Sequence, residues 1–354
     1  MAGNTIGKAL QLTTFGESHG PALGGILDGF PAGIELDLEA VQKELDRRRP
    51  GQSQLTTPRK ESDRIEILSG IFEGRSTGTP IAFLFRNEDK KSQDYEHLRD
   101  VFRPSHADFT YSAKYGYRDH RGGGRSSARE TVCRVAAGAI ARQLLKNVRI
   151  EAWVHQVGSH RVPFSVEEVN PTGIEENELR WPDPGSLSSA IELIERLRDE
   201  GDTIGGVIAC RITGVPAGWG EPVFDKLHSD LASAMMSINA AKGFDIGGGF
   251  DRLELPGSIQ NDAFEEGGGT RTNFSGGIQG GISNGQPIYF RVAFKPIATI
   301  KKEQDTIRAT GEPTILEAKG RHDPTVLPRA VPIVEAMAAL VLADHYLRHK
   351  TNMP

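Results

Sequence analysis

The sequence predicts an α+β fold in a single domain, because strand and helix patterns are interspersed without a regular β-α rhythm. Apolar residues alternate with polar ones in several segments, which is typical of half-buried strands. Apolar residues at helical spacing occur in others. The strands are expected near 10–14, 64–68, 81–85, 150–157, 207–212 and 288–294, and the helices near 38–48, 128–146, 187–200, 222–237 and 332–348.

Local signals set the expected helix ends. Ser127-Ala128-Arg129-Glu130 has the form of a capping box. Gly201 supplies a stop signal, and Pro222 and Pro332 suit first-turn positions.

An internal sequence repeat predicts two related halves. Residues 69–81 and 276–288 agree at about half of their positions, and Pro-Ala-Gly precedes each copy, at 31–33 and 216–218. Chance matching of glycine and proline is the alternative, since the chain has 41 glycines. We expect one domain over 1–354, with pseudo-symmetric halves at about 1–160 and 187–354.

Composition restricts the function classes. Forty-two Lys and Arg face 47 Asp and Glu, a net charge of −5, which argues against nucleic-acid or membrane-surface partners. The amino terminus does not resemble a signal peptide and no 18-residue apolar run is expected, so we predict a cytoplasmic protein. Cys133 and Cys210 have no metal-site spacing, so we expect buried free thiols and no metal.

A histidine in a glycine-flanked turn is the first candidate. Residues 16–20, Gly-Glu-Ser-His-Gly, match the nucleophile motif of serine hydrolases. That motif needs a helix directly after it, whereas Pro21 and Gly24 follow here, so a hydrolase using Ser18 is rejected. His19 remains, with a functional or a structural role.

A basic stretch predicts anion binding. Residues 103–129 hold six Lys or Arg against two Asp, and the Gly122–Gly124 loop leads to a helix start, which favours anions. An ordinary capped helix with solvated arginines is the alternative. The arginines at 47–49 end a helix, where cations suit the dipole, or belong to a basic flap reaching Arg59.

Two later segments add candidates. Residues 243–285 contain thirteen glycines, and such loops can wrap a planar cofactor or a phosphate. Asp323 precedes a helix, and a helix cap is the simpler interpretation of it.

Seven motifs, in order, resemble the chorismate synthase family over nearly the whole chain: GESHG, RRRPG, RPxHAD, GRSSARET, SINAxKG, GGxxNGQPI and RxDPT. The resemblance implies central helices between antiparallel sheets and a homotetramer. It also implies loss of phosphate and a ring hydrogen from 5-enolpyruvylshikimate 3-phosphate in an anti 1,4-elimination, giving chorismate and requiring reduced FMN.

The resemblance also assigns residues. His19 is similar to the histidine beside the leaving phosphate, His106 to the one beside the flavin, and Asp323 to the carboxylate near flavin N5. Flavin-contacting positions are matched by Arg125, Ser126, Ser127, Asn239, Ala240, Gly280, Lys295, Pro296, Ile297, Ala298, Thr299 and Arg321. Substrate or nicotinamide contacts are matched by Arg48, Arg49, Arg59 and Arg129.

Gln54 stands where many relatives have arginine, which weakens the case for nicotinamide binding. No reductase-like domain is visible, so we expect an external flavin reductase, with NADPH only as a source of reductant. A non-catalytic flavin or polyanion binder is the remaining alternative.

Overall fold

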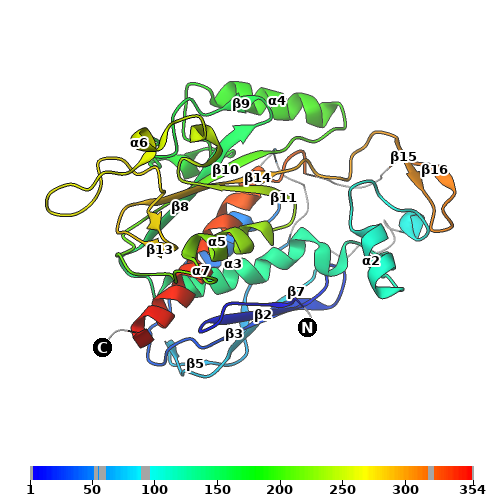
Figure 1. The fold of residues 1–354 in the computed structure, drawn as a ribbon. Coiled ribbons are helices and arrows are strands. Elements are labelled where there is room, and N and C mark those ends of the chain that lie inside the picture. Colours follow the sequence, from blue (N-terminus) through cyan, green and yellow to red (C-terminus); the bar gives the residue numbers. More distant parts are fainter. Residues whose placement is uncertain (1–2, 52–54, 56–60, 89–95, 318–322, 353–354) are drawn as a thin grey trace.

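A computed structural model describes residues 3–51, 55, 61–88, 96–317 and 323–352. Two five-stranded antiparallel sheets enclose a layer of helices, which confirms the predicted α+β sandwich (Figure 1). The first sheet has the order β1 (Thr5–Ile6), β2 (Gln11–Gly16), β3 (Ala22–Asp28), β7 (Ile81–Arg86) and β4 (Glu66–Ile67). The second has β9 (His160–Arg161), β8 (Arg149–Val157), β10 (Gly206–Thr213), β14 (Ile288–Phe294) and β11 (Ala241–Ile246).

The helices between the sheets are α1 (Leu38–Arg48), α3 (Thr131–Arg142), α5 (Leu227–Met236) and α7 (Leu327–Asn352). Helix α4 (Leu187–Asp199) lies beyond the second sheet, and α2 (Asp108–Tyr115) lies at one end of the sandwich (Figure 1). The remaining elements are α6 (Gly257–Gln260), the paired strands β15 (Gln304–Ile307) and β16 (Pro313–Leu316), and two short hairpins, β5 (Ile71–Phe72) with β6 (Arg75–Ser76) and β12 (Ile278–Gln279) with β13 (Ile282–Ser283).

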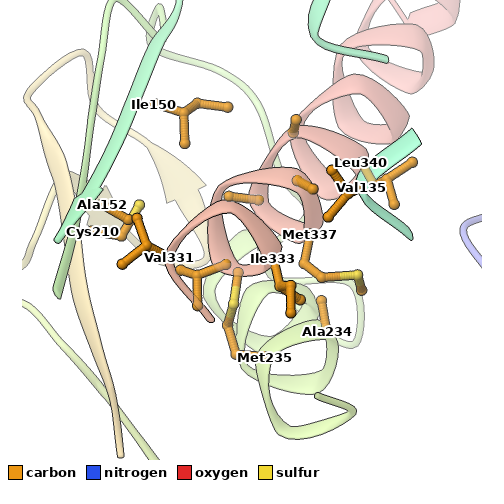
Figure 2. Packing of buried hydrophobic residues seen from close by; sticks show 14 of the residues in the cluster. Val135, Ile150, Ala152, Cys210, Ala234, Met235, Val331, Ile333, Met337 and Leu340 are labelled. Carbon is orange, nitrogen blue, oxygen red and sulfur yellow. The ribbon is translucent and has the colours of Figure 1, made fainter. Parts of the chain in front are cut away.

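Helix α7 forms the centre of the core. Its Val331, Ile333, Met337 and Leu340 pack toward α3, α5 and the second sheet (Figure 2). Helix α3 approaches it closely, because a Cβ on Gly138 would lie 2.5 Å from the Cβ of Ala336. Helix α7 is long and apolar enough to cross a membrane, but 89% of its apolar stretch is buried inside the protein. Its apolar surface is thus already covered by the core.

Both cysteines are free and buried, as predicted. Cys210 pairs with Phe290 across β10 and β14 in the second sheet. Burial raises the pKa of Cys133 to about 12, so its thiol stays protonated at neutral pH.

The two copies of the internal repeat form the two short hairpins. Ser76 Oγ donates to Pro31 O at 2.6 Å and accepts from Ile34 N at 3.0 Å. Ser283 Oγ donates to Pro216 O at 2.6 Å and accepts from Trp219 N at 2.9 Å. The two hairpins thus make matching contacts. However, β8 belongs to the second sheet although it precedes residue 160, and the proposed division of the domain stays a prediction.

Several expected boundaries are wrong. Helix α5 begins five residues after Pro222, and α7 begins at Leu327, so Pro332 lies inside the helix. Proline at 332 lacks the N–H that would bond to Pro328 O, and the guanidinium of Arg180 donates to that carbonyl instead.

The predicted capping box before α3 forms only in part, because Ser127 is an N-cap but Glu130 does not complete the box. Residues 128–130 form a 3-10 turn, and Ser127 Oγ accepts from Arg129 N at 3.3 Å. Glu130 does not complete the box, because it accepts hydrogen bonds from Thr14 Oγ1 at 2.7 Å and Arg134 Nε at 2.8 Å.

The sequence patterns missed strand β3. Its sequence contains Gly24 and Gly25, which weaken a strand signal. A Cβ on Gly24 would lie 2.4 Å from the ring of Phe15 on the neighbouring strand, so this strand requires glycine there.

Candidate active site

A cavity of about 420 Å³ lies where the end of α1, the start of α3 and the first turns of α7 meet two loops of the second half. Its size is in the range of ordinary small-molecule sites. It gathers twelve of the predicted site residues from six separate parts of the sequence. They are Arg48, His106, Ser126, Ser127, Arg129, Asn239, Ala240, Lys295, Pro296, Ile297, Ala298 and Asp323.

A buried carboxylate joins two of the four arginines that were predicted to contact substrate or nicotinamide. Asp63 Oδ2 accepts from Arg48 Nη2 at 2.7 Å, and Asp63 Oδ1 accepts from Arg129 Nη1. Burial raises the pKa of Asp63, but both arginines outweigh it and hold that pKa below its usual value. Burial lowers the pKa of Arg48 to about 10, so it remains a cation at neutral pH. The two guanidinium groups are therefore fixed before any ligand arrives.

The sequence reasoning missed Asp63, which lies in a polar run without a motif. Its φ of 47° is in the left-handed region, which aspartate tolerates better than most residues. No local pattern could have shown that its side chain is buried against Arg48 and Arg129.

Asp323 does not cap helix α7. Leu327 N donates to Thr325 Oγ1 at 3.4 Å, whereas Asp323 Oδ2 accepts from Arg329 Nη1 at 2.7 Å. Arg329 also donates through Nε to the carbonyl of Arg48 at 3.2 Å. The cap interpretation is thus wrong, and an ion pair orients the carboxylate at the cavity.

His106 reaches the cavity from the segment before α2. Its Nδ1 lies 2.9 Å from Asp108 Oδ1, and Asp108 was not among the predicted site residues. The His-x-Asp spacing next to the helix start was the available signal. The neighbouring Ser105 carbonyl accepts from Lys295 Nζ at 3.1 Å, which joins this segment to the second half.

Asn239 and Ala240 form another part of the cavity lining. Asn239 Nδ2 donates to Ser126 O at 2.7 Å, while its Oδ1 is buried and has no hydrogen-bond partner among the described residues. Ala240 adopts a φ of 67°, and its carbonyl accepts from Lys295 N at 3.0 Å. A buried acceptor without a partner is costly and is typical of a site that completes its hydrogen bonds with a ligand.

His19 lies beside the site rather than among the cavity-lining residues. Gly122 packs against it, since a Cβ there would lie 2.4 Å from the His19 ring. Asn87 Nδ2 donates to the carbonyls of Glu17 and Gly20 at 3.0 and 2.9 Å, and so fixes the turn that carries His19.

Arg125 also lies apart from the cavity lining. It donates to Thr14 Oγ1 at 2.7 Å, Thr14 O at 3.0 Å and Gly16 O at 3.2 Å, so it ties a second 3-10 turn, Gly124–Ser126, to β2. It faces a larger open cleft of about 1050 Å³, which holds no other predicted site residue.

Gly280 is not brought to the cavity. It lies in the turn between β12 and β13, and Ser283 of that hairpin accepts from Gly218 N at 2.9 Å. Gly218 packs near His349 in the last turns of α7, whereas the cavity lies at the first turns. Gly280 therefore does not line this cavity, and its flavin contact stays a prediction.

Arg49 and Thr299 do not line the cavity either. Arg49 follows α1 and pairs with Asp46 at 3.5 Å, and Thr299 is buried at 7% exposure. Arg59, Arg321 and Gln54 lie outside the described residues.

Four cations, at positions 48, 129, 295 and 329, face this cavity together with His106. Two carboxylates also line it: Asp323 pairs with Arg329 at 2.7 Å, and Glu61 lies 3.6 Å from Arg129. A concave site with fixed guanidinium groups, a histidine held by a carboxylate and an oriented acid defines an enzyme that acts on a small polyanion.

Comparison with known proteins gives the particular family. A family model described as chorismate synthase matches residues 10–347. The chain is 57% identical over 352 residues to the chorismate synthase of Christiangramia forsetii and 58% identical over 354 residues to that of Phocaeicola vulgatus, with 99% of each chain covered in both cases. A crystal structure of chorismate synthase matches with a TM-score of 0.76 at 33% identity, covering 97% of this chain and 93% of that chain. The chain therefore belongs to the chorismate synthase family, and it is a lyase of the shikimate pathway.

Proposed function

We propose that this chain converts 5-enolpyruvylshikimate 3-phosphate to chorismate and phosphate by an anti 1,4-elimination that requires reduced FMN. The observation that carries the proposal is the Arg48–Asp63–Arg129 cluster at a cavity that also presents His106 and Asp323. Substrate and flavin together bring two carboxylates and two phosphates, whose burial is prohibitive without paired cations.

The residues of the cavity fit a flavin. The buried Oδ1 of Asn239 can accept from a ring N–H, and the backbone around Ala240 and Lys295 is fixed by its own hydrogen bonds. Ser126, Ser127, Asn239, Ala240 and residues 295–298 would hold it. Reduced FMN, when bound, would supply and recover electrons in each turnover, so that the reaction has no net redox change.

The side chains at the site bind the substrate and transfer protons. Arg48, Arg129 and Arg329 bind and orient the anionic groups of the substrate. His19 donates a proton toward the departing phosphate, and His106 holds a proton beside the flavin. Asp323 takes part in removing the ring proton. Imidazole suits both proton tasks, because its ordinary pKa is near working pH.

The proposal extends to the setting of the reaction. The enzyme acts in the cytoplasm as a homotetramer, and an external flavin reductase supplies reduced FMN. NADPH serves only as the source of reductant.

Anaerobic phosphate release from the phosphorylated substrate tests the proposal directly. We expect turnover with reduced FMN, far exceeding the amount of flavin present, and none without flavin. Full turnover with oxidised FMN and no reductant would contradict it. Tight flavin binding without any phosphate release would instead indicate a non-catalytic flavin or polyanion binder.

A further inference from the structure

The contact between His106 and Asp108 constrains where the imidazole carries its proton. Nδ1 of His106 lies 2.9 Å from Oδ1 of Asp108. An ionised carboxylate can only accept a hydrogen bond, so Nδ1 must be the donor. In the neutral ring the other nitrogen, Nε2, is then the proton acceptor, and it remains for a ligand in the cavity that His106 lines.

Asp108 is held as an anion by two buried arginines. Arg103 donates through Nε to Oδ2 and through Nη2 to Oδ1, both at 2.8 Å, and its backbone N–H donates at 3.1 Å. Arg118 Nη1 lies 2.9 Å from Oδ1. Burial raises the pKa of Asp108, but the hydrogen bonds from Arg103 and His106 outweigh it and hold that pKa well below its usual range.

The surroundings of Asp108 leave it little freedom to move. Its side chain is 2% exposed, and it is the first residue of α2, where a carboxylate also suits the helix dipole. Asp108 is thus an oriented, charged acceptor beside the partly buried His106. In catalytic sites, a carboxylate placed in this way fixes the tautomer of the imidazole.

We propose that Asp108 is a positioning residue that keeps the Nδ1–H tautomer of His106, so that every proton exchanged with the cavity passes through Nε2. When the ring accepts a proton, the new N–H bond forms at Nε2. When it gives one up, that same bond breaks and Nδ1–H is retained. The catalytic consequence of this positioning rests on the role proposed for His106. The assignment of the tautomer does not depend on that role.

The chain contains a matched pair with the opposite orientation. His345, near the C-terminal end of α7, has its Nε2 2.9 Å from Asp230 Oδ2 and is 2% exposed. Neither residue lines the candidate cavity. The same argument therefore assigns His345 the Nε2–H tautomer.

Nitrogen NMR of the full chain labelled with ¹⁵N-histidine tests both assignments at mildly alkaline pH. His106→Gln and His345→Gln variants identify the two signals. We expect His106 to show protonated Nδ1 and bare Nε2, and His345 the reverse. Protonated Nε2 in neutral His106 would overturn the proposal, whatever the activity of the enzyme.

Kinetics then test the catalytic consequence. Asp108→Asn should lower kcat roughly 10²-fold, the effect of impaired acid–base catalysis, with KM and flavin affinity changed far less. Asp230→Asn should leave kcat within about two-fold, because it lies outside the site. Unchanged kcat in a folded Asp108→Asn variant would overturn the positioning role. If that variant does not fold, the tautomer measured in the wild-type protein still decides between the two outcomes for Asp108. A wild-type protein that releases no phosphate would count against the proposed function alone.

Discussion

Arg129 donates through Nε to Asn87 Oδ1 at 3.1 Å, and this contact joins the cavity to the turn that carries His19. Both ends of the Asn87 amide are hydrogen-bonded, since its Nδ2 also donates to two carbonyls of that turn. A predicted substrate arginine and a predicted proton donor are thus fixed relative to each other by one neutral side chain.

Asn87→Asp keeps the acceptor for Arg129 but removes the two donors, and places a carboxylate against two carbonyls. We expect kcat to fall roughly 10-fold or more, with a loss of stability of about 2 kcal/mol for two hydrogen bonds. Asn273→Asp is the control, because Asn273 holds a turn in the same way, donating to Pro287 O at 2.8 Å. Equal kcat values for the two variants in a phosphate-release assay would contradict the role of Asn87.

Arg129 and Arg49 should behave differently when replaced by Ala. Arg129→Ala leaves buried Asp63 with one partner fewer, which typically costs about 3–5 kcal/mol of stability, and lowers substrate affinity about 10- to 150-fold. Arg49→Ala should lower the free energy of unfolding by less than about 1 kcal/mol, since the Arg49 side chain is 46% exposed and its pair with Asp46 lies at the surface. Urea unfolding and equilibrium substrate binding measure both effects. Unchanged substrate affinity in a folded Arg129→Ala variant would show that Arg129 has only a structural role.

Asp323→Asn keeps the shape of the side chain and an oxygen that can accept from Arg329. It cannot take up a proton at neutral pH. We expect near-native flavin and substrate binding with a turnover roughly 10²–10⁴-fold lower. The measurement is single-turnover phosphate release with saturating reduced FMN. Near-native turnover there would remove Asp323 from the catalytic residues.

His106 and His19 should give different spectra on replacement. His106 lines the cavity that we propose binds flavin, whereas His19 lies against Gly122 outside its lining. We therefore expect His106→Ala to change the absorbance spectrum of bound FMN. His19→Ala should leave that spectrum largely normal while slowing phosphate release. The reverse pattern would show that the two roles are exchanged.

Acid should destabilise the protein through Asp108 and Asp63. The pKa of each is lower in the folded state than the ordinary value near 3.9, so the unfolded chain binds more protons as the pH falls through that value. Their contribution is complete above about pH 5 and is lost progressively below it. Chemical unfolding between about pH 3 and 7 should show this slope, and Asp63→Asn should flatten it even though it lowers stability at neutral pH. A slope equal to that of the wild type would contradict the assignment to Asp63.

The sequence by itself determined the parts of the molecule that depend on local periodicity. Alternation located β7, β8, β10 and β14, and helical spacing located α1, α3, α4, α5 and α7, because these patterns reflect which side of each element faces the core. The basic stretch and the motifs identified His106, Arg129 and Asp323 without any structure. Those residues then met at one cavity.

The tertiary structure decided what depends on residues distant in the sequence. Strand β3 has glycine at position 24 because the ring of Phe15 on the neighbouring strand occupies the space of a side chain there. The interior Pro332 is tolerated because Arg180 satisfies the freed carbonyl. The partnership of Asp63 with two arginines and the separation of Gly280 from the cavity are likewise invisible in local patterns. Hydrogen bonds and ion pairs act over a few ångströms of space rather than over positions in the chain, so only the packed fold could show which polar groups meet.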